Sequence, residues 1–387
     1  MRRWALPEAI DDVLPVEAAR VETLRRTLLD CFRAHGYRLV QPPLVEYLDS
    51  LLTGSGRDLD LQTFKTVDPL SGRLLGLRAD TTPQVARIDA HLLNEPGVSR
   101  LCYAGSVLRT VPAGPGATRE VLQIGAELYG FGEIAADREV LRLLLRALTN
   151  AKIDGLHVDL GHVGIYRALA QSAGLAGDGE GDDSELFAAL RDKDVPSVHD
   201  LTAAFPEPAR TALRKLSELY GPAAATLAAA QRALPALPEI SDALRTIASL
   251  AEAVADGAML HVDLAELRGY HYYTGATFDV FAAGTHGSTV ECGRGGRYDG
   301  VGRAFGRARP ATGFTLDLRR VAALVNDGGA CDPIVAPADD DPALVAKIIE
   351  LRATGEAVVV LLPGENADPR TVRRLARDGP GWRVLTR

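Results

Sequence analysis

Apolar residues recur at helical spacing near the start of the chain. Val21, Leu24 and Leu28 fall on one face of a helix predicted over residues 15–35, and Gly36 follows as a stop signal. Two further helices are predicted over residues 83–95, with a proline in the first turn, and over residues 137–151. Each of these segments is expected to place one face against a core.

Apolar runs bounded by turn residues predict strands in much of the remaining sequence. Residues 63–70 and 72–80 form a predicted hairpin, because Asp, Pro, Ser and Gly join them. The pentapeptide LHVDL occurs at residues 156–160 and 260–264, and both copies are predicted to be strands rather than a repeat. Further strands are predicted over residues 100–109, 120–130, 274–284, 288–296 and from 313 onward.

Two segments depart from this pattern. An Ala-rich, mostly helical region over about 165–257 is predicted to be an insertion in a sheet domain. After residue 328 the order strand, helix, strand, helix, strand predicts a short α/β unit with a parallel sheet. Residues 1–327 are therefore predicted to form an α+β domain with antiparallel hairpins, and residues 328–387 a second, short unit.

Composition and charge narrow the classes of function. The 387 residues are 47% hydrophobic, enough for a large core, and the net charge of −8 comes without any basic run that would neutralise phosphates. No nucleic-acid partner is therefore predicted. No membrane partner is predicted either, because no stretch of about 18 apolar residues occurs. The four cysteines form no C-x-x-C pair, which predicts reduced thiols, a cytoplasmic location and no metal site.

Five motifs in order carry a resemblance to a known family. They are LRADTTPQVAR, LRTVPAGPGATREVLQIGAELYG, LRGYHYYTGATFDV, CGRGGRYDG and ATGFTLDLRRVAAL. Over residues 5–327 this series resembles histidyl-tRNA synthetase, a class II aminoacyl-tRNA synthetase. The resemblance implies an antiparallel sheet flanked by helices, and a dimer interface near Pro43. The C-terminal unit resembles a truncated anticodon-binding domain, too short for the complete one.

The resemblance implies a pocket for histidine. Such a ligand needs an acceptor for its ammonium group, a donor for its carboxylate and an acceptor for a ring N–H. Asp80, Arg268 and Glu127 would supply these three. The residues that match the family's histidine-binding positions are Asp80, Thr82, Gln123, Glu127, Arg268, Tyr272 and Tyr273.

The nucleotide half of the site departs from the synthetase. Arg109, Arg119 and Arg320 match basic positions of the family's nucleotide site, which is expected to be vestigial here. Val111 replaces the glutamate that would accept from adenine, and loss of such a buried partner costs about 1 to 3 kcal/mol. Asp317 stands where the family has glycine. Adenylation is therefore expected to be impaired, and no catalytic residue or cofactor is predicted.

A kept amino-acid pocket beside a decayed nucleotide site resembles the regulatory subunits of ATP phosphoribosyltransferase. That resemblance implies a non-catalytic protein whose partner is the short-form catalytic subunit of the first step of histidine biosynthesis. It also implies histidine as the feedback effector and self-association as a class II-type dimer. One alternative is an active ATP-dependent ligase similar to histidyl-tRNA synthetase, and the other is an interaction module whose pocket is vestigial.

Several residues of the expected pocket also fit a purely structural role. Asp80 and Thr82 are suited to capping the helix at residue 83. Gln123 and Glu127 could both be solvated on one strand face. Two adjacent residues of a strand point to opposite faces, so only one of the two tyrosines at 272 and 273 is expected in the pocket.

Two further pairs of residues have a structural interpretation. Arg109 and Arg320 could be kept as ion-pair partners. His157 and His261 alternate with apolar residues in the LHVDL strands, which favours sheet residues over metal ligands.

Overall fold

A computed structural model of the chain describes residues 4–53, 57–114, 116–175, 184–254, 258–284, 287–325, 332–368, 370–379 and 381–386. These residues form two compact units, one built mainly from the chain up to Val325 and the other mainly from the chain after it. The predicted domain boundary between residues 327 and 328 lies outside the described ranges.

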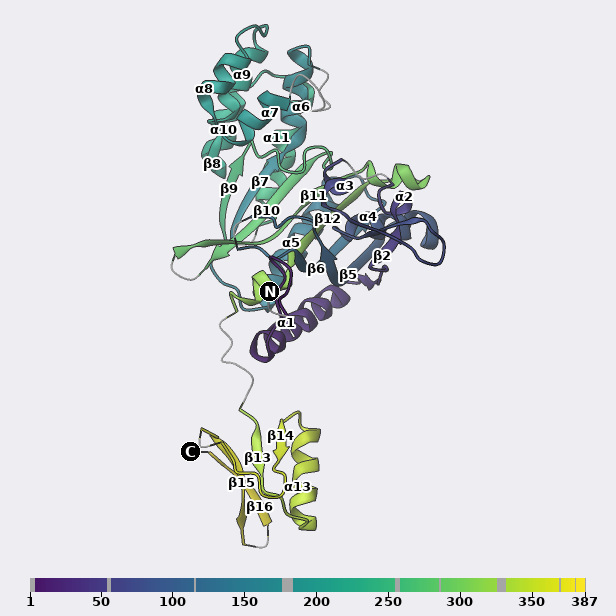
Figure 1. Cartoon of the computed structure of the whole chain (residues 1–387). Coiled ribbons are helices and arrows are strands. Elements are labelled where there is room, and N and C mark those ends of the chain that lie inside the picture. Colours follow the sequence, from purple (N-terminus) through teal and green to yellow (C-terminus); the bar gives the residue numbers. More distant parts are fainter. Residues whose placement is uncertain are drawn as a thin grey trace. The chain divides into compact units, whose positions relative to one another are not determined.

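A nine-stranded sheet organises the larger unit (Figure 1). Its strand order is β1-β5-β6-β12-β11-β10-β7-β9-β8, and neighbours are antiparallel except for β1–β5 and β7–β9. The strands are β1 (Arg38–Leu39), β5 (Ser99–Leu108), β6 (Glu120–Tyr129), β7 (His157–His162), β8 (Tyr220–Pro222), β9 (Met259–Asp263), β10 (Ala276–Ala283), β11 (Thr289–Arg297) and β12 (Ala311–Asp317).

One face of this sheet forms the main core with the helices α1 (Pro15–Ala34) and α5 (Ile134–Asn150). Ile124 and Leu128 of β6 belong to that core, and the ring of Phe32 on α1 packs edge-on against Phe314 of β12 at 5.6 Å. The alternate residues of β6, Gln123 and Glu127, point to the opposite face, as the period of two requires. The short helix α12 (Leu318–Ala322) continues directly from β12.

The chain between β7 and β9 is mostly helical, and it packs at the end of the sheet that these two strands form (Figure 1). Tyr166 and Leu169 of α6 and Leu250 of α11 are buried in its core. The helices are α6 (Val163–Ser172), α7 (Ser184–Arg191), α8 (Val195–Leu201), α9 (Ala209–Leu216), α10 (Ala223–Ala233) and α11 (Pro238–Ala251). Because β7 and β9 are parallel neighbours, a connection with this many residues can join them.

A small three-stranded antiparallel sheet lies beside the early part of the chain. It consists of β2 (Val45–Tyr47), β3 (Phe64–Val67) and β4 (Leu74–Leu77), and the hairpin β3–β4 is the one predicted from sequence. The short helices α2 (Leu48–Leu51) and α3 (Arg57–Gln62) lie between β2 and β3. The helix predicted over residues 83–95 is shorter than expected: α4 (Thr82–Arg87) passes into a π-helical turn (Ile88–Leu93).

The smaller unit has its own core of Ile334, Leu344, Ile348, Val358 and Leu375. Its elements are β13 (Ile334–Ala336), α13 (Pro342–Ala353), β14 (Val358–Val360), β15 (Arg373–Asp378) and β16 (Gly381–Thr386), in the sheet order β14-β13-β15-β16.

The predicted second helix and fully parallel sheet of this unit are wrong. The segment expected to be helical is β15, which pairs antiparallel with β16 although β13 is parallel to both β14 and β15. A tight connection explains the difference, because Asp378 pairs with Gly381 and Gly379 has φ of +58°. A hairpin with Leu375 turned into the core therefore replaces the helix.

The other predicted helices and strands of the larger unit are present with small changes of boundary. The two LHVDL segments are the neighbouring strands β7 and β9. Within the described residues, no helix is long and apolar enough to cross a membrane.

We expect Arg297→Ala to lower the free energy of unfolding by about 3 to 5 kcal/mol, because it leaves a buried carboxylate without its cation. Arg297 Nη2 lies 2.7 Å from Asp137 Oδ2, and the two side chains are only 10% and 4% exposed. Urea denaturation measures the change. The control is Arg245→Ala, whose pairing with Asp242 is at the surface and is expected to be worth under about 1 kcal/mol. Equal effects of the two substitutions would contradict this assignment.

Candidate functional site

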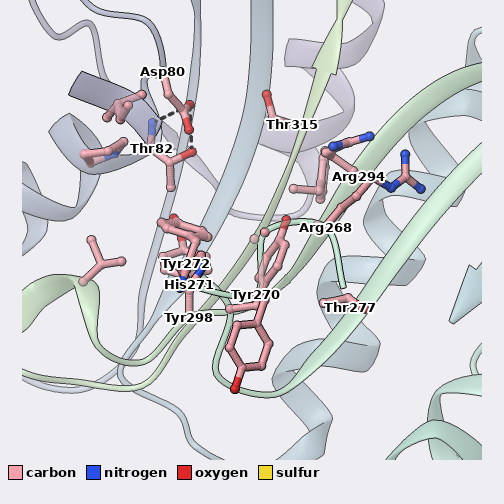
Figure 2. A pocket seen from close by; sticks show the side chains of 18 of the residues that line it. Asp80, Thr82, Arg268, Tyr270, His271, Tyr272, Thr277, Arg294, Tyr298 and Thr315 are labelled. Atoms are coloured by element: carbon pink, nitrogen blue, oxygen red, sulfur yellow. Dashed lines mark hydrogen bonds between the residues drawn. The ribbon is translucent and has the colours of Figure 1, made fainter. Parts of the chain in front are cut away.

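A cavity of about 720 Å³ lies on the sheet face opposite α1 and α5 (Figure 2). Its walls come from β6, β10, β11 and β12, from the start of α4 and from residues 267–274. The structure brings all seven residues predicted to bind histidine to this one cavity: Asp80, Thr82, Gln123, Glu127, Arg268, Tyr272 and Tyr273. Their role in binding stays a prediction.

Asp80 is held at the entrance to α4 by hydrogen bonds from two directions. Its Oδ1 accepts from Gln123 Nε2 at 2.8 Å and from the backbone N–H of Thr82 at 3.2 Å. Gln123 Oε1 accepts in turn from the N–H of Thr81 at 2.9 Å. Asp80 thus contacts Thr82, the first residue of α4, although the N-cap position itself is Thr81, and it lines the cavity as well.

Glu127 is a buried acid at the base of the cavity. Its side chain accepts hydrogen bonds from Tyr298 OH and from Tyr103 OH, the latter at 3.3 Å. Burial, with a smaller contribution from the nearby Asp80 carboxylate, raises the pKa of Glu127 to about 8, although these hydrogen bonds oppose the shift. The hypothesis that Gln123 and Glu127 are solvated is wrong, because they are 2% and 1% exposed.

The lack of a side chain at Gly313 leaves space for the Glu127 carboxyl group. Gly313 of β12 pairs directly with Glu127 of β6, and a Cβ atom at Gly313 would collide with Glu127 Oε2. Gly295 of β11 is also close-packed, since a Cβ there would meet the carbonyl oxygen of Gly313. Substitution of Gly313 would therefore displace the Glu127 carboxylate.

The two tyrosines lie in a turn, so the predicted strand with opposite faces is wrong. Gly269 has φ of +73°, and its carbonyl oxygen accepts from the backbone N–H of both Tyr272 and Tyr273 at 2.8 Å. Both side chains consequently line the cavity. The ring of Tyr272 stacks on Tyr298 with centroids 4.9 Å apart.

Two buried hydroxyl groups of the cavity wall have hydrogen-bonding capacity that no described protein atom uses. They are Tyr272 OH and Thr277 Oγ1. Leaving a buried polar group without a partner costs about 1 to 3 kcal/mol. A polar ligand group that reached either hydroxyl would relieve this cost.

Arg268 lines the cavity but is already paired with carboxylates. Its guanidinium lies 2.8 Å from Glu266, 3.4 Å from Asp279 and 3.7 Å from Glu291. Arg294, which Figure 2 shows beside it, contacts Glu291 at 2.5 Å and Asp279 at 3.6 Å. A ligand carboxylate would have to share Arg268 with this network.

Sequence reasoning missed several residues of the cavity wall. They are Thr277, Asp279, Arg294, Tyr298 and Thr315. Thr277 and Asp279 alternate with the apolar Phe278 and Val280 on β10. Polar residues at every second position of a predicted strand could have indicated that they share a face with the pocket residues.

The three arginines of the predicted nucleotide site are not gathered in the cavity. Only Arg109 lines it, where its Nε donates to the carbonyl oxygen of Ala79 at 3.4 Å. Arg119 lies over the ring of Phe64 at 4.8 Å, and Arg320 belongs to α12 outside the lining.

The two substitutions expected to weaken adenylation have separate structural settings. Val111 is 60% exposed. Asp317 caps α12, because its Oδ1 accepts from the backbone N–H of Arg319 at 3.0 Å and of Arg320 at 3.4 Å. Asp317 is not part of the cavity lining.

Comparison with known proteins places this geometry in a family. A family model described as histidyl-tRNA synthetase matches residues 9–321, and one described as ATP phosphoribosyltransferase subunit HisZ C-terminal domain matches residues 332–385. The ATP phosphoribosyltransferase regulatory subunit of Ralstonia nicotianae is 53% identical over 100% of this chain and 99% of its own length. That of Cupriavidus taiwanensis is 54% identical over 99% of both chains.

The chain belongs to the family of ATP phosphoribosyltransferase regulatory subunits. A solved regulatory subunit/histidyl-tRNA synthetase from Bacillus halodurans superimposes with a TM-score of 0.80 at 26% identity, covering 95% of both chains. Histidyl-tRNA synthetase from Nostoc, at 16% identity, shares the fold with a TM-score of 0.75 over 97% of this chain and 92% of its own. The predicted class II synthetase-like fold of the regulatory subunit is therefore confirmed.

We expect Glu127→Gln to reduce the pH dependence of stability. The folded-state pKa of about 8 exceeds the ordinary value of 4.5, so between these values the native state holds a proton that the unfolded state releases. Stability from this group is thus fully present below pH 4.5 and is lost as pH rises towards about 8. The loss is about 1.4 kcal/mol for each unit of difference in pKa.

Urea denaturation near pH 6 and above pH 8 measures this effect. Glu120→Gln is the matched control, because Glu120 is exposed on the same strand and should leave the pH dependence of the unaltered protein in place. If Glu127→Gln loses as much stability between the two pH values as the unaltered protein does, Glu127 is not the buried acid described.

Proposed function

We propose that this chain is a non-catalytic subunit that senses histidine for a short-form ATP phosphoribosyltransferase catalytic subunit. It is required for that partner's activity in the first step of histidine biosynthesis and mediates feedback inhibition. The observation that carries the proposal is the cavity, in which a buried carboxylic acid, a second carboxylate and a guanidinium converge in a member of the regulatory subunit family.

The ligand groups of histidine match the groups of the cavity one by one. Asp80 supplies an anionic acceptor for the ammonium group. Glu127, held by two tyrosine hydroxyls, supplies an acceptor for an imidazole N–H. Arg268 supplies a donor for the carboxylate from the turn that also carries Tyr272 and Tyr273. The unused hydroxyls of Tyr272 and Thr277 add polar partners in the same wall.

The nucleotide half supports a protein without aminoacylation activity of its own. Of the three arginines that match nucleotide-binding positions, only Arg109 lines the cavity. Val111 offers no acceptor for an adenine amino group, and Asp317 brings a carboxylate close to Arg109 and Arg320. The competing function, an active histidyl-tRNA synthetase-like ligase, requires rapid histidine-dependent ATP–pyrophosphate exchange by the pure protein.

Assembly is part of the proposal. Apolar side chains exposed on the small sheet support self-association as a dimer, with Val45 40%, Val67 57% and Leu74 52% exposed. Histidine would favour one arrangement of the hetero-oligomer, and coupling of about 1 to 3 kcal/mol is enough for useful feedback. A cytoplasmic location is supported by the free, buried thiols of Cys31, Cys102 and Cys292.

Histidine binding is expected to release protons at neutral pH. An incoming ammonium or N–H group favours ionised Glu127, whose pKa of about 8 leaves it largely protonated in the protein alone. Calorimetry in two buffers of different ionisation enthalpy measures the release. In Glu127→Gln the release should disappear and the affinity should fall by about 1 to 3 kcal/mol.

The matched control for this titration is Glu120→Gln, which should bind histidine as the unaltered protein does. Gly313→Ala is a second test, because its methyl group would displace Glu127 without removing any polar atom. Unchanged histidine affinity in both Glu127→Gln and Gly313→Ala would place the ligand elsewhere.

Mixing with the short-form catalytic subunit tests the assembly. The chain should co-purify with that subunit, raise its phosphoribosyl transfer rate and confer inhibition by histidine. Glu127→Gln should keep the activation and shift the inhibition to higher histidine concentrations, since it alters only the cavity. The pure chain should have about twice its 41.2 kDa mass by light scattering. Catalysis that is equally fast without this chain would reject the proposal.

A further inference from the structure

Three potential metal ligands meet on two neighbouring strands outside the cavity. His157 and Asp159 lie on β7 and His261 lies on β9, with Asp159 and His261 paired in the parallel register. Val158, between His157 and Asp159, and Val262, next to His261, are buried in the core, so the three ligands share the other face of the sheet. One ligand atom from each residue lies within 4.8 Å of the other two.

The three side chains are already in contact. His157 Nε2 and Asp159 Oδ1 are 2.7 Å apart, and the rings of His157 and His261 are 4.3 Å apart at an angle of 81°. All three are half-buried, which restricts their rotamers and leaves access for an ion and a water molecule. None of them lines the cavity.

The charges around Asp159 favour a cation. Asp159 pairs directly with Asp279 of β10, and carboxylates opposite each other across two strands repel. Asp279 is neutralised by Arg268 at 3.4 Å and Arg294 at 3.6 Å. Among the ion pairs of the described residues, Asp159 has a partner only in His157, so no arginine or lysine compensates it.

We propose that His157, Asp159 and His261 bind a divalent transition-metal ion, of which zinc is the best match. Two imidazoles and one carboxylate are a recurrent zinc ligand set, and three protein ligands leave a coordination position for water. Neutral imidazole is also a good ligand for cobalt, nickel and copper ions. The sequence predicted correctly that His157 and His261 are strand residues. It did not predict that their side chains lie next to each other and next to Asp159.

Such an ion would crosslink β7 and β9, the strands that precede and follow the helical segment. Asp159 precedes that segment and His261 follows it, so the ion would close a loop of roughly 100 residues. Because an ion that binds only the folded state stabilises it, Tm should rise with zinc concentration.

Tag-free full-length protein, stripped of metal with a chelator, is titrated with Zn²⁺ against a chromophoric competitor. We expect one tight site per chain and a Co²⁺ adduct with the visible spectrum of a tetrahedral or five-coordinate site. Asp159→Asn and His261→Gln should each weaken Zn²⁺ binding by more than about 100-fold, since outer-shell partners alone are worth roughly 10- to 100-fold.

The matched control is His199→Ala, an exposed histidine of α8 that should leave Zn²⁺ affinity unchanged. Circular dichroism and Tm of the metal-free variants show whether each is folded, and Asp159→Asn preserves the shape of the side chain. Zn²⁺ affinity that is the same in Asp159→Asn, His261→Gln and the unaltered protein would overturn the proposal. The proposal would also be overturned if the folded protein bound Zn²⁺ no more tightly than the denatured protein does.

Discussion

The candidate site depends on one buried carboxylic acid in the middle of the large sheet. Glu127 pairs with Leu101 of β5 on one side and Gly313 of β12 on the other, and its side chain is 1% exposed at the base of the cavity. A carboxyl group in this position needs hydrogen bonds and space. Tyr103 and Tyr298 supply the hydrogen bonds, and glycine at 313 supplies the space. One acidic residue thus constrains the sequence of three strands around it.

The balance of charge around this acid supports the proposed class of ligand. Asp80, Glu127 and Asp279 present three acidic groups to the cavity, and the guanidinium groups of Arg268 and Arg294 are shared with carboxylates. A zwitterion can satisfy both signs in such a site, because its ammonium meets the acids while its carboxylate meets an arginine. A triphosphate would meet the same carboxylates with several negative charges, so the site is better suited to an amino acid than to a nucleotide.

The sequence predicted what local patterns determine and missed what depends on long-range pairing. Helix α1 and the strands β5 and β6 follow from apolar periodicity, and the motifs located Glu127 and the six other predicted residues of the cavity lining. The turn at Gly269 was missed because positive φ is not encoded in an apolar pattern. The ion-pair network of Arg294 and the convergence of Asp159 with His261 depend on strand register, which places residues far apart in sequence next to each other. The hairpin β15–β16 replaced a predicted helix because of the tight connection at Gly379, whose positive φ an apolar pattern does not reveal.

The turn of residues 267–274 lines the cavity and also packs in the core of the helical segment. A ligand that contacts this turn would therefore be connected to the helices through it. Tyr270 is buried between the rings of Tyr166 on α6 and Phe187 on α7, both at 5.3 Å, while Arg268 of the same turn lines the cavity. Glu266 holds this turn twice, because it pairs with the Arg268 guanidinium and accepts from the Arg268 backbone N–H at 2.8 Å, so a ligand carboxylate that took Arg268 from Glu266 would remove one of these contacts. Close-packed aromatic rings resist continuous deformation, so under the proposed function a displaced turn would require α6 and α7 to repack. In the proposed sensor, this turn is the contact that would link occupancy of the cavity to the packing of α6 and α7, as the coupling of two sites requires.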